Sequence, residues 1–378
     1  MKKAKKILKA LLPHGVVVLY KRRLEIMSKA AVTKSGGGIN NRKIAVIIPF
    51  LNVKYGELLR EAVRKAGYEV TEDPSDAKYI WLHWYENGIE NYADFLNKLS
   101  AIKTWKDQGR KVIVHVHNKK PHESPVPELT HALMTALLDG ADQVSIMSTE
   151  TKSVLKDIWY YGDDLDLVSH VPHPNYIGAY GHMLKPAKSL KDDTLKIVFF
   201  GLVRPYKGIE YLIAATEGVK NVEVSILGKP KDDDYVAMLK KLCAGRDNVK
   251  FRLEHIPDED LPEIFASHHI VALPYSIESS LNSGAALLAL SYARTIVGTN
   301  NGTLKDLENK DLYFGYDYKD EADHVKQLRK TILAIHKKYD GKYNNLLSVG
   351  ERAYKSVEKN NSIDVVAESI KHMIHKMG

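Results

Sequence analysis

The segment 273–302, LPYSIESSLNSGAALLALSYARTIVGTNNG, decides the fold of this chain. It opens at the end of an apolar strand that stops at Pro274, passes through a polar loop, and becomes helical and apolar over 285–293. A second apolar strand follows at 295–297. The order strand, loop, helix, strand is typical of a parallel βαβ unit. We therefore predict an α/β fold.

The loop in this segment ends in small polar residues where the helix begins. Free backbone N–H groups at the positive end of a helix bind phosphate well. We interpret this loop as the pyrophosphate seat of a nucleotide-linked donor, formed by Ser280, Asn282, Ser283 and Gly284. The alternative is that Asn282 or Ser283 only caps the helix.

Length and composition set the outer limits. A chain of 378 residues with 44% hydrophobic and 27% charged residues is typical of a protein with two globular domains. Its single cysteine, Cys243, excludes an internal disulfide and a cysteine-rich metal site. No apolar run approaches the roughly 20 residues of a membrane span, and we find no signal peptide with a cleavage site.

The positive charge is concentrated in residues 1–40, which carry ten Lys and Arg against one acid, whereas the whole chain has a net charge of +8. The remainder is close to neutral, so we expect no nucleic-acid partner. Apolar residues from Ala4 to Leu12 share one helical side, with lysines mostly on the other. We predict an amphipathic basic helix on an anionic membrane surface, followed by a linker at 35–38. The alternative is a helix packed on its own domain.

Strands and helices alternate from residue 43 onward, which predicts doubly wound, mostly parallel sheets. We expect an N-terminal Rossmann-like domain over 41–185, a C-terminal one over 186–345, and C-terminal helices over 346–378. Ligands of such sheets lie beyond the carboxyl ends of the strands. In the first domain these ends carry polar and aromatic side chains: His83, Trp84, His117, Asn118, His122, Glu123, His170 and His173.

A second phosphate-binding candidate lies at 201–208, GLVRPYKG, where a buried strand ends. Arg204 can grip phosphate oxygens with two N–H groups, and Lys207 supplies a point charge. Together they can stabilise a departing diphosphate. Either cation alone would be better explained as a solvated surface residue.

The second half resembles the donor domain of GT-B glycosyltransferases of the family 4 type. The resemblance rests on 200–208, on Gly228 after the next strand, and on 256–261, IPDEDL. It implies two domains facing a cleft, a nucleotide bound in the C-terminal half with Gly228 among the binding residues, an acceptor in the N-terminal half, and last helices that cross back to the first domain. The chain departs from the family at its paired glutamates, which align with Ser280 and Leu288.

The segment 282–290 and the motifs of the first half are similar to those of β-mannosyltransferases that act on lipid-linked glycans. By this resemblance, the chain transfers a hexose from GDP-mannose or a UDP-sugar to a lipid-linked or growing cell-surface glycan. The basic arm then holds the enzyme at the inner face of the cytoplasmic membrane. The alternatives are a nucleotide-sugar epimerase of the same fold and a non-catalytic, membrane-bound partner that binds sugar nucleotides.

Catalysis by an inverting enzyme needs a base near the acceptor hydroxyl, and the candidates are His117, His122 and Glu123. His115 alternates into its strand and is expected in the core. No two-His-plus-acid spacing on one helix face is present, and family 4-type enzymes bind their donor without a metal. We therefore expect neither a metal ion nor a cofactor, the nucleotide sugar being a substrate.

Overall fold

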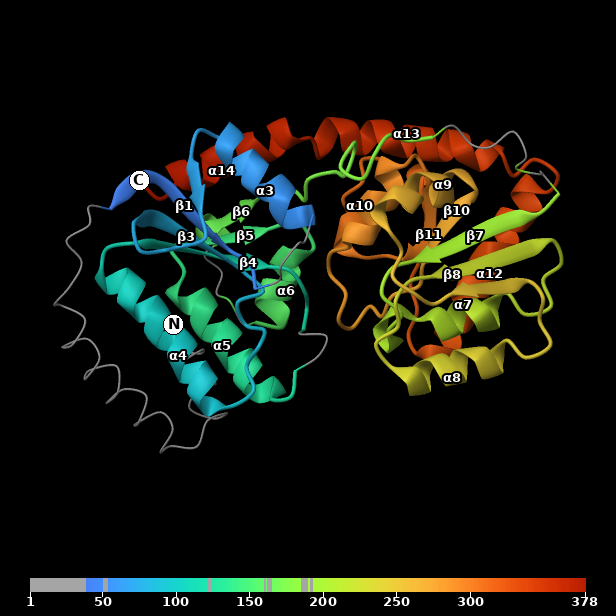
Figure 1. The fold of residues 1–378 in the computed structure, drawn as a ribbon, viewed down its shortest axis with the longest axis horizontal. Helices are drawn as coiled ribbons and strands as arrows, with labels where there is room; N and C mark the ends of the chain where they lie inside the picture. Colours follow the sequence, from blue (N-terminus) through green and yellow to red (C-terminus); the bar gives the residue numbers. More distant parts are fainter. Residues whose placement is uncertain are drawn as a thin grey trace. The chain divides into compact units, whose positions relative to one another are not determined.

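The computed structural model describes residues 39–49, 54–120, 124–159, 161, 165–184, 190 and 193–378. They form two compact units, each built on a six-stranded sheet (Figure 1). Unit 1 contains the described residues up to His173 and the segment Ile363–Gly378, and unit 2 is Pro174–Ser362. The chain thus divides before the expected boundary at 185/186. The predicted amphipathic helix lies outside the described residues.

Unit 1 has a fully parallel sheet in the order β2-β1-β3-β4-β5-β6. Its strands are β1 (Asn40–Ile47), β2 (Glu69–Thr71), β3 (Ala77–His83), β4 (Lys111–Val116), β5 (Gln143–Ile146) and β6 (Val168–His170). Its helices are α3 (Lys54–Lys65), α4 (Tyr92–Asp107), α5 (Pro127–Gly140), α6 (Thr151–Asp157) and α14 (Ile363–His375), with a 3₁₀ turn η1 (Leu165–Leu167). Figure 1 shows α3 and α14 on one face of the sheet and α4 and α5 on the other.

Helix α14 joins unit 1 through an apolar face that packs against α3 and the sheet. Val366, Ala367, Ile370 and Met373 are at most 2% exposed and belong to the same core cluster as the strands β1 and β3. Burial of this face from solvent is the main force that holds the helix there. The preceding helix, α13 (Asn345–Asn360), belongs to unit 2, so the segment expected over 346–378 divides between the units.

Unit 2 has a parallel sheet in the order β12-β11-β10-β7-β8-β9. Its strands are β7 (Leu195–Phe200), β8 (Val222–Leu227), β9 (Val249–Arg252), β10 (Ile270–Leu273), β11 (Thr295–Thr299) and β12 (Phe314–Tyr316). Besides α13, its helices are α7 (Ile209–Ala215), α8 (Asp233–Leu242), α9 (Leu261–Ala266), α10 (Gly284–Ser291), α11 (Gly302–Lys305) and α12 (Glu321–Tyr339). Three 3₁₀ turns complete it: η2 (Pro205–Lys207), η3 (Asp258–Asp260) and η4 (Lys310–Leu312).

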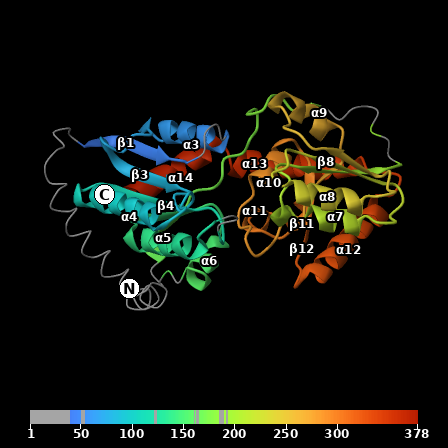
Figure 2. The same cartoon turned by 60° about the horizontal axis from the view of Figure 1, so that its bottom comes forward.

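The helices of unit 2 also cover both faces of its sheet. Helices α7, α8 and α12 lie on one face and α9, α10 and α13 on the other, as Figures 1 and 2 show. Strands covered on both faces are mostly apolar. Every residue of β10 and of β11 is buried. The predicted pair of doubly wound sheets is confirmed. Within the described residues, no helix has the length and apolarity needed to cross a membrane.

Candidate functional site

The sheet of unit 2 has its topological switch point between β7 and β10. From β7 the chain proceeds outward to β8 and β9 on one side, and then from β10 to β11 and β12 on the other. In open α/β sheets, ligands bind in the crevice beyond the carboxyl ends of the strands at such a point. The loop after β7 carries Arg204 and Lys207, and the loop after β10 carries the segment 275–284. The two segments predicted to bind a diphosphate therefore flank this switch point.

These two loops are in direct backbone contact. The N–H of Ser276 donates a hydrogen bond of 2.9 Å to the carbonyl oxygen of Tyr206. Gly208 makes this approach possible, because a Cβ atom there would lie 2.1 Å from the carbonyl oxygen of Pro274. Its φ of +64° also lies in the left-handed region that favours glycine. A larger residue at 208 would push the loops apart.

Gly228 has a similar role one strand further on. A Cβ atom at this position would lie 1.8 Å from the carbonyl oxygen of Gly201, and φ is +147°. The loops after β7 and β8 can therefore cross closely only with glycine at 228. The resemblance implied nucleotide binding at Gly228, and the structure gives this residue a packing role at the same edge of the sheet.

Lys207 lies across the ring of Tyr275, with its Nζ 3.7 Å from the ring centroid. Burial, and next the positive charge of Arg204, lower the pKa of Lys207 to about 7 from its ordinary 10.5. Two cations held this close are unfavourable until an anion joins them. Burial raises the pKa of the Tyr275 hydroxyl, and Ser283 of the turn 280–284 lies close enough to lower it in part. This hydroxyl has no hydrogen-bond partner in the described part of the chain. The Tyr275 ring thus contacts Lys207 of the loop after β7, and its hydroxyl lies near Ser283 of the turn 280–284.

The turn 280–284 begins helix α10, and Ser283 is its N-cap. The Ser283 hydroxyl accepts a 3.1 Å hydrogen bond from the N–H of Ala286, and its own N–H donates to Thr303 Oγ1 at 2.9 Å. The capping role that the sequence left open for Ser283 is therefore present. The first N–H groups of the helix, at Gly284 and Ala285, have no partner within it and remain at its positive end. The Ser280 hydroxyl is buried with no hydrogen-bond partner in the described part of the chain.

A cavity of about 560 Å³ lies beside the loops after β7 and β10. Its lining comes from three segments: Pro205, Tyr206, Glu210 and Tyr211; 276–278; and 318–321. Arg204, Lys207 and the turn 280–284 do not line it. Glu278, two residues before the position Ser280 that aligns with the family's first glutamate, is part of its lining. The position of the second glutamate is Leu288, a buried side chain of α10 that offers no carboxylate.

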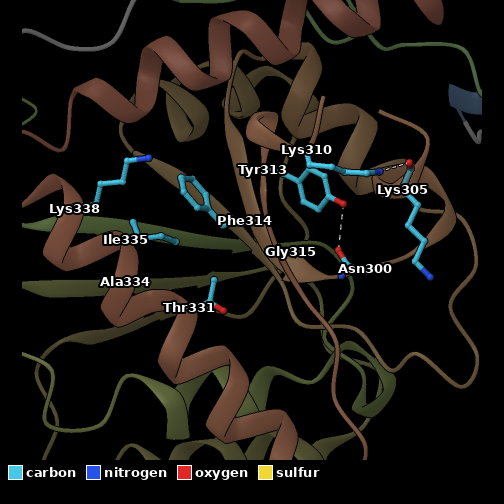
Figure 3. A pocket seen from close by; sticks show the side chains of 10 residues that line it. All are labelled: Asn300, Lys305, Lys310, Tyr313, Phe314, Gly315, Thr331, Ala334, Ile335 and Lys338. Atoms are coloured by element: carbon cyan, nitrogen blue, oxygen red, sulfur yellow. Dashed lines mark hydrogen bonds between the residues drawn. The ribbon is translucent and has the colours of Figure 1, made fainter. Parts of the chain in front are cut away.

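A second cavity, of about 530 Å³, lies between β12 and α12 (Figure 3). Lys305, Lys310 and Lys338 line it beside the rings of Tyr313 and Phe314. The Tyr313 hydroxyl donates a 3.2 Å hydrogen bond to the side-chain oxygen of Asn300, as Figure 3 shows. None of the predicted donor-binding residues lines this cavity, which lies at the edge strand of the sheet.

In unit 1 the switch point falls between β1 and β3, and β3 ends at His83. His83 Nδ1 and His117 Nε2 are 3.0 Å apart, and the ring of Trp84 stacks on that of His117 with centroids 3.4 Å apart. His115 pairs with His83 across β3 and β4 and is buried, as expected. Burial lowers the pKa of all three histidines, that of His115 to about 3, so their rings are neutral. His122 and Glu123 lie outside the described residues.

Glu86 is a candidate that the sequence analysis missed. It follows β3 by three residues, is 8% exposed, and has a pKa raised to about 7 by burial. Lys98, whose Nζ donates to the carbonyl oxygens of Tyr85 and Asn87 at 2.8 and 2.9 Å, lowers it only in part. The sequence signal for Glu86 was an acidic residue shortly after His83 and Trp84, where β3 ends. Its burial could not be read from the sequence.

Comparison with known proteins agrees with this geometry. The family model for Glycosyl transferases group 1 matches residues 194–335. Two forms of a GDP-mannose:glycolipid 4-beta-D-mannosyltransferase from Xanthomonas campestris are 32% identical over 104 residues. That match covers 27% of this chain and 29% of the relative, so the chain matches less than a third of the relative's length.

Solved structures share the fold over most of the chain. Anabaena HepE, solved with UDP and glucose, is 15% identical with a TM-score of 0.57 and covers 84% of this chain and 81% of its own. Sucrose-phosphate synthase from Thermosynechococcus elongatus is 14% identical with a TM-score of 0.63, covering 89% and 98%. A glycosyltransferase from Rickettsia africae is 12% identical with a TM-score of 0.63, covering 89% and 99%.

The fold of this chain is that of the GT-B glycosyltransferases, as the sequence resemblance implied. Residues 194–335, in its second unit, match the family model for Glycosyl transferases group 1.

Proposed function

We propose that this chain is a glycosyltransferase that transfers a hexose from a nucleotide sugar to a lipid-linked or growing cell-surface glycan. The observation that carries the proposal is the contact between the Arg204–Lys207 loop and the turn 275–284 at the switch point of unit 2. The family match over residues 194–335, which contains both loops, supports it.

The proposed chemistry uses the positive charge of this seat. As the anomeric bond breaks, negative charge grows on the departing diphosphate, and groups already directed at it stabilise the transition state. Arg204 supplies a full charge, Lys207 does so when it is protonated, and the first N–H groups of α10 supply partial charge. No metal is needed for this role, because the cations are already in place.

For the donor we propose GDP-mannose, with a UDP-sugar as the second choice. The name of the Xanthomonas relative supports GDP-mannose and a glycolipid acceptor, and HepE was solved with UDP. The position of Ser280 in place of a family glutamate means that other groups hold the donor sugar. Glu278, in the cavity beside the seat, is the nearest described carboxylate along the chain.

For the base, we propose a carboxylate rather than His117. His117 is 5% exposed, is stacked under Trp84, and has a pKa well below its ordinary range, which makes it a weak proton acceptor. A base works best with a pKa near the working pH, and Glu86 meets that condition. His122 and Glu123 remain the other candidates.

We further propose that residues 1–38 hold the enzyme on the inner face of the cytoplasmic membrane. Their charge and apolar periodicity support binding to anionic lipid. Without these residues, the protein should no longer sediment with vesicles of anionic phospholipid but should keep turnover on a water-soluble acceptor analogue. Unchanged sedimentation would contradict the anchor.

The direct test of the activity is release of nucleoside diphosphate from nucleotide sugars in the presence of a lipid-linked glycan. Arg204→Ala should lower kcat/KM by about 100-fold or more, whereas Arg352→Ala, an exposed arginine of α13, should change it less than about twofold. Epimer formation without acceptor would instead support the epimerase, and equal activity of the two variants would refute the phosphate seat.

A further inference from the structure

Three buried histidines meet at the carboxyl ends of the two central strands of unit 1. His83 ends β3 and lies beside His115 of β4 in register, and His117 follows two residues after His115, beyond the end of the strand. Their exposed fractions are 0%, 2% and 5%. One ring nitrogen from each lies within 4.8 Å of those of the other two.

Two ring nitrogens of this histidine cluster have no hydrogen-bond partner among the described residues. The Nε2 atoms of both His83 and His115 are buried and have no hydrogen-bond partner in the described part of the chain. Ser145 Oγ accepts a 2.9 Å hydrogen bond from Trp81 Nε1 and lies 2.7 Å from His115 Nδ1. If His115 donates through Nδ1, its Nε2 carries the lone pair, as in histidines that bind metal through one nitrogen while a neighbour orients the other. Two unpartnered ring nitrogens in one buried cluster indicate a missing ligand.

The backbone beside the cluster is strained. Trp84 has a φ of +48°, a value that residues other than glycine rarely adopt. Its ring stacks on His117 at an interplanar angle of 10°. Such strain persists where the surroundings enforce it, and it occurs often at ligand sites. Here the strained residue is the one whose ring stacks on His117, the third histidine of the cluster.

We propose that His83, His115 and His117 bind one divalent transition-metal ion, with Zn²⁺ as the best fit. Neutral imidazole is a preferred ligand of Zn²⁺, Cu²⁺, Ni²⁺ and Co²⁺, whereas Mg²⁺ and Ca²⁺ require oxygen ligands. Tetrahedral Zn²⁺ separates its ligand nitrogens by roughly 3.3 Å. One ring nitrogen from each of the three histidines lies within 4.8 Å of those of the other two, so an ion would have to draw the rings together by about 1 to 1.5 Å.

This site goes beyond the proposed function and does not depend on it. No metal-ligand spacing on a single helix face predicted it, because the three histidines come from two neighbouring strands that end at the same sheet edge. Because the rings are almost fully buried, the ion would be enclosed and would fix the ends of β3 and β4.

The test is metal binding by the full, untagged chain. Protein stripped of metal with a chelator and titrated with Co²⁺ should bind one equivalent, with the visible absorption of tetrahedral Co²⁺, and Zn²⁺ should displace it. Zn²⁺ should also raise the melting temperature of the stripped protein. A folded protein that binds no stoichiometric Co²⁺ or Zn²⁺ would overturn the proposal.

Variants assign the ion to this cluster. His115→Gln should weaken Co²⁺ binding by about 100-fold or more, and Ser145→Ala, which removes the group that orients His115, by about 10- to 100-fold. The matched control is His324→Gln, because His324 is also fully buried with an unpartnered ring nitrogen but packs among tyrosines of unit 2. It should bind one equivalent with unchanged affinity. If His115→Gln does not fold, Ser145→Ala provides the comparison, and equal affinity of Ser145→Ala and the parent would then refute the assignment.

Discussion

Donor binding should weaken as the pH rises above 7, because it depends on the charge of Lys207. Burial and the neighbouring Arg204 lower the pKa of this lysine to about 7. The ammonium lies across the Tyr275 ring, 3.7 Å from its centroid, at the seat proposed for the diphosphate. A bound diphosphate would favour the charged form and move the pKa back toward 10.5, the ordinary value for lysine.

The size of the effect follows from this difference in pKa. Between about 7 and the pKa of the complex, each unit of pH should lower the apparent affinity for GDP or UDP by up to about tenfold, with uptake of one proton.

The stability of the folded chain changes with pH in the opposite direction. The pKa of Lys207 is lower in the folded than in the unfolded chain, so its contribution to the free energy of unfolding rises with pH between 7 and 10.5. Weaker binding in this range would therefore not reflect unfolding caused by this lysine.

The assay is calorimetric titration with GDP and UDP between pH 7 and 8.5, in pairs of buffers that differ in ionisation enthalpy. Phosphate itself titrates near pH 6, so most of its change falls below this range. Lys207→Arg is the matched control, because a guanidinium stays charged throughout and should make the affinity nearly independent of pH. Lys207→Ala should bind weakly at every pH. Equal affinity of the parent protein at pH 7 and 8.5, without proton uptake, would refute the argument.

Three further variants test the surroundings of the site. Gly228→Ala should lower the free energy of unfolding in urea by roughly 3 kcal/mol, because the new Cβ would lie 1.8 Å from a backbone oxygen. The control is Gly245→Ala, whose Cβ would have no atom within 4 Å and which should cost only about 1 kcal/mol. Equal costs of the two substitutions would contradict the close approach at Gly228. Arg294→Met should cost about 3 kcal/mol, since its guanidinium donates to four backbone carbonyls, and an unchanged urea midpoint would show that these bonds do not stabilise unit 2. Glu86→Gln should lower kcat by about 100-fold and remove an acid limb near pH 7 from its pH profile; a profile like that of the parent would exclude Glu86 as the base.

Much of the architecture could be predicted from the sequence, because hydrophobic patterning is local. Apolar runs bounded by turn residues marked the strands, and their alternation with helices implied parallel sheets. The ends of the strands and helices were predicted less accurately. The strand expected at 295–297 extends over Thr295–Thr299, and the helix expected over 285–293 is Gly284–Ser291. Tertiary pairing, which the local pattern does not contain, decides where a strand stops.

The candidate site could be predicted only in part from the sequence. The sequence pointed to Arg204, Lys207 and the turn 280–284 from the residue types that bind phosphate. It did not contain the contact between Tyr206 and Ser276, which arises because β7 and β10 are neighbours despite their distance along the chain. It also left open whether Ser283 caps the helix, and the structure shows that it does.

The sequence alone therefore determined the fold class, the cationic loop and the basic N-terminal segment, since each is written in consecutive residues. Only the tertiary structure decided which side chains are buried together: Lys207 across Tyr275, Glu86 with a raised pKa, and the histidines of two strands in one cluster. The physical reason is that pKa and ligand geometry depend on desolvation and on distances between segments remote in sequence, and these exist only once the chain has folded.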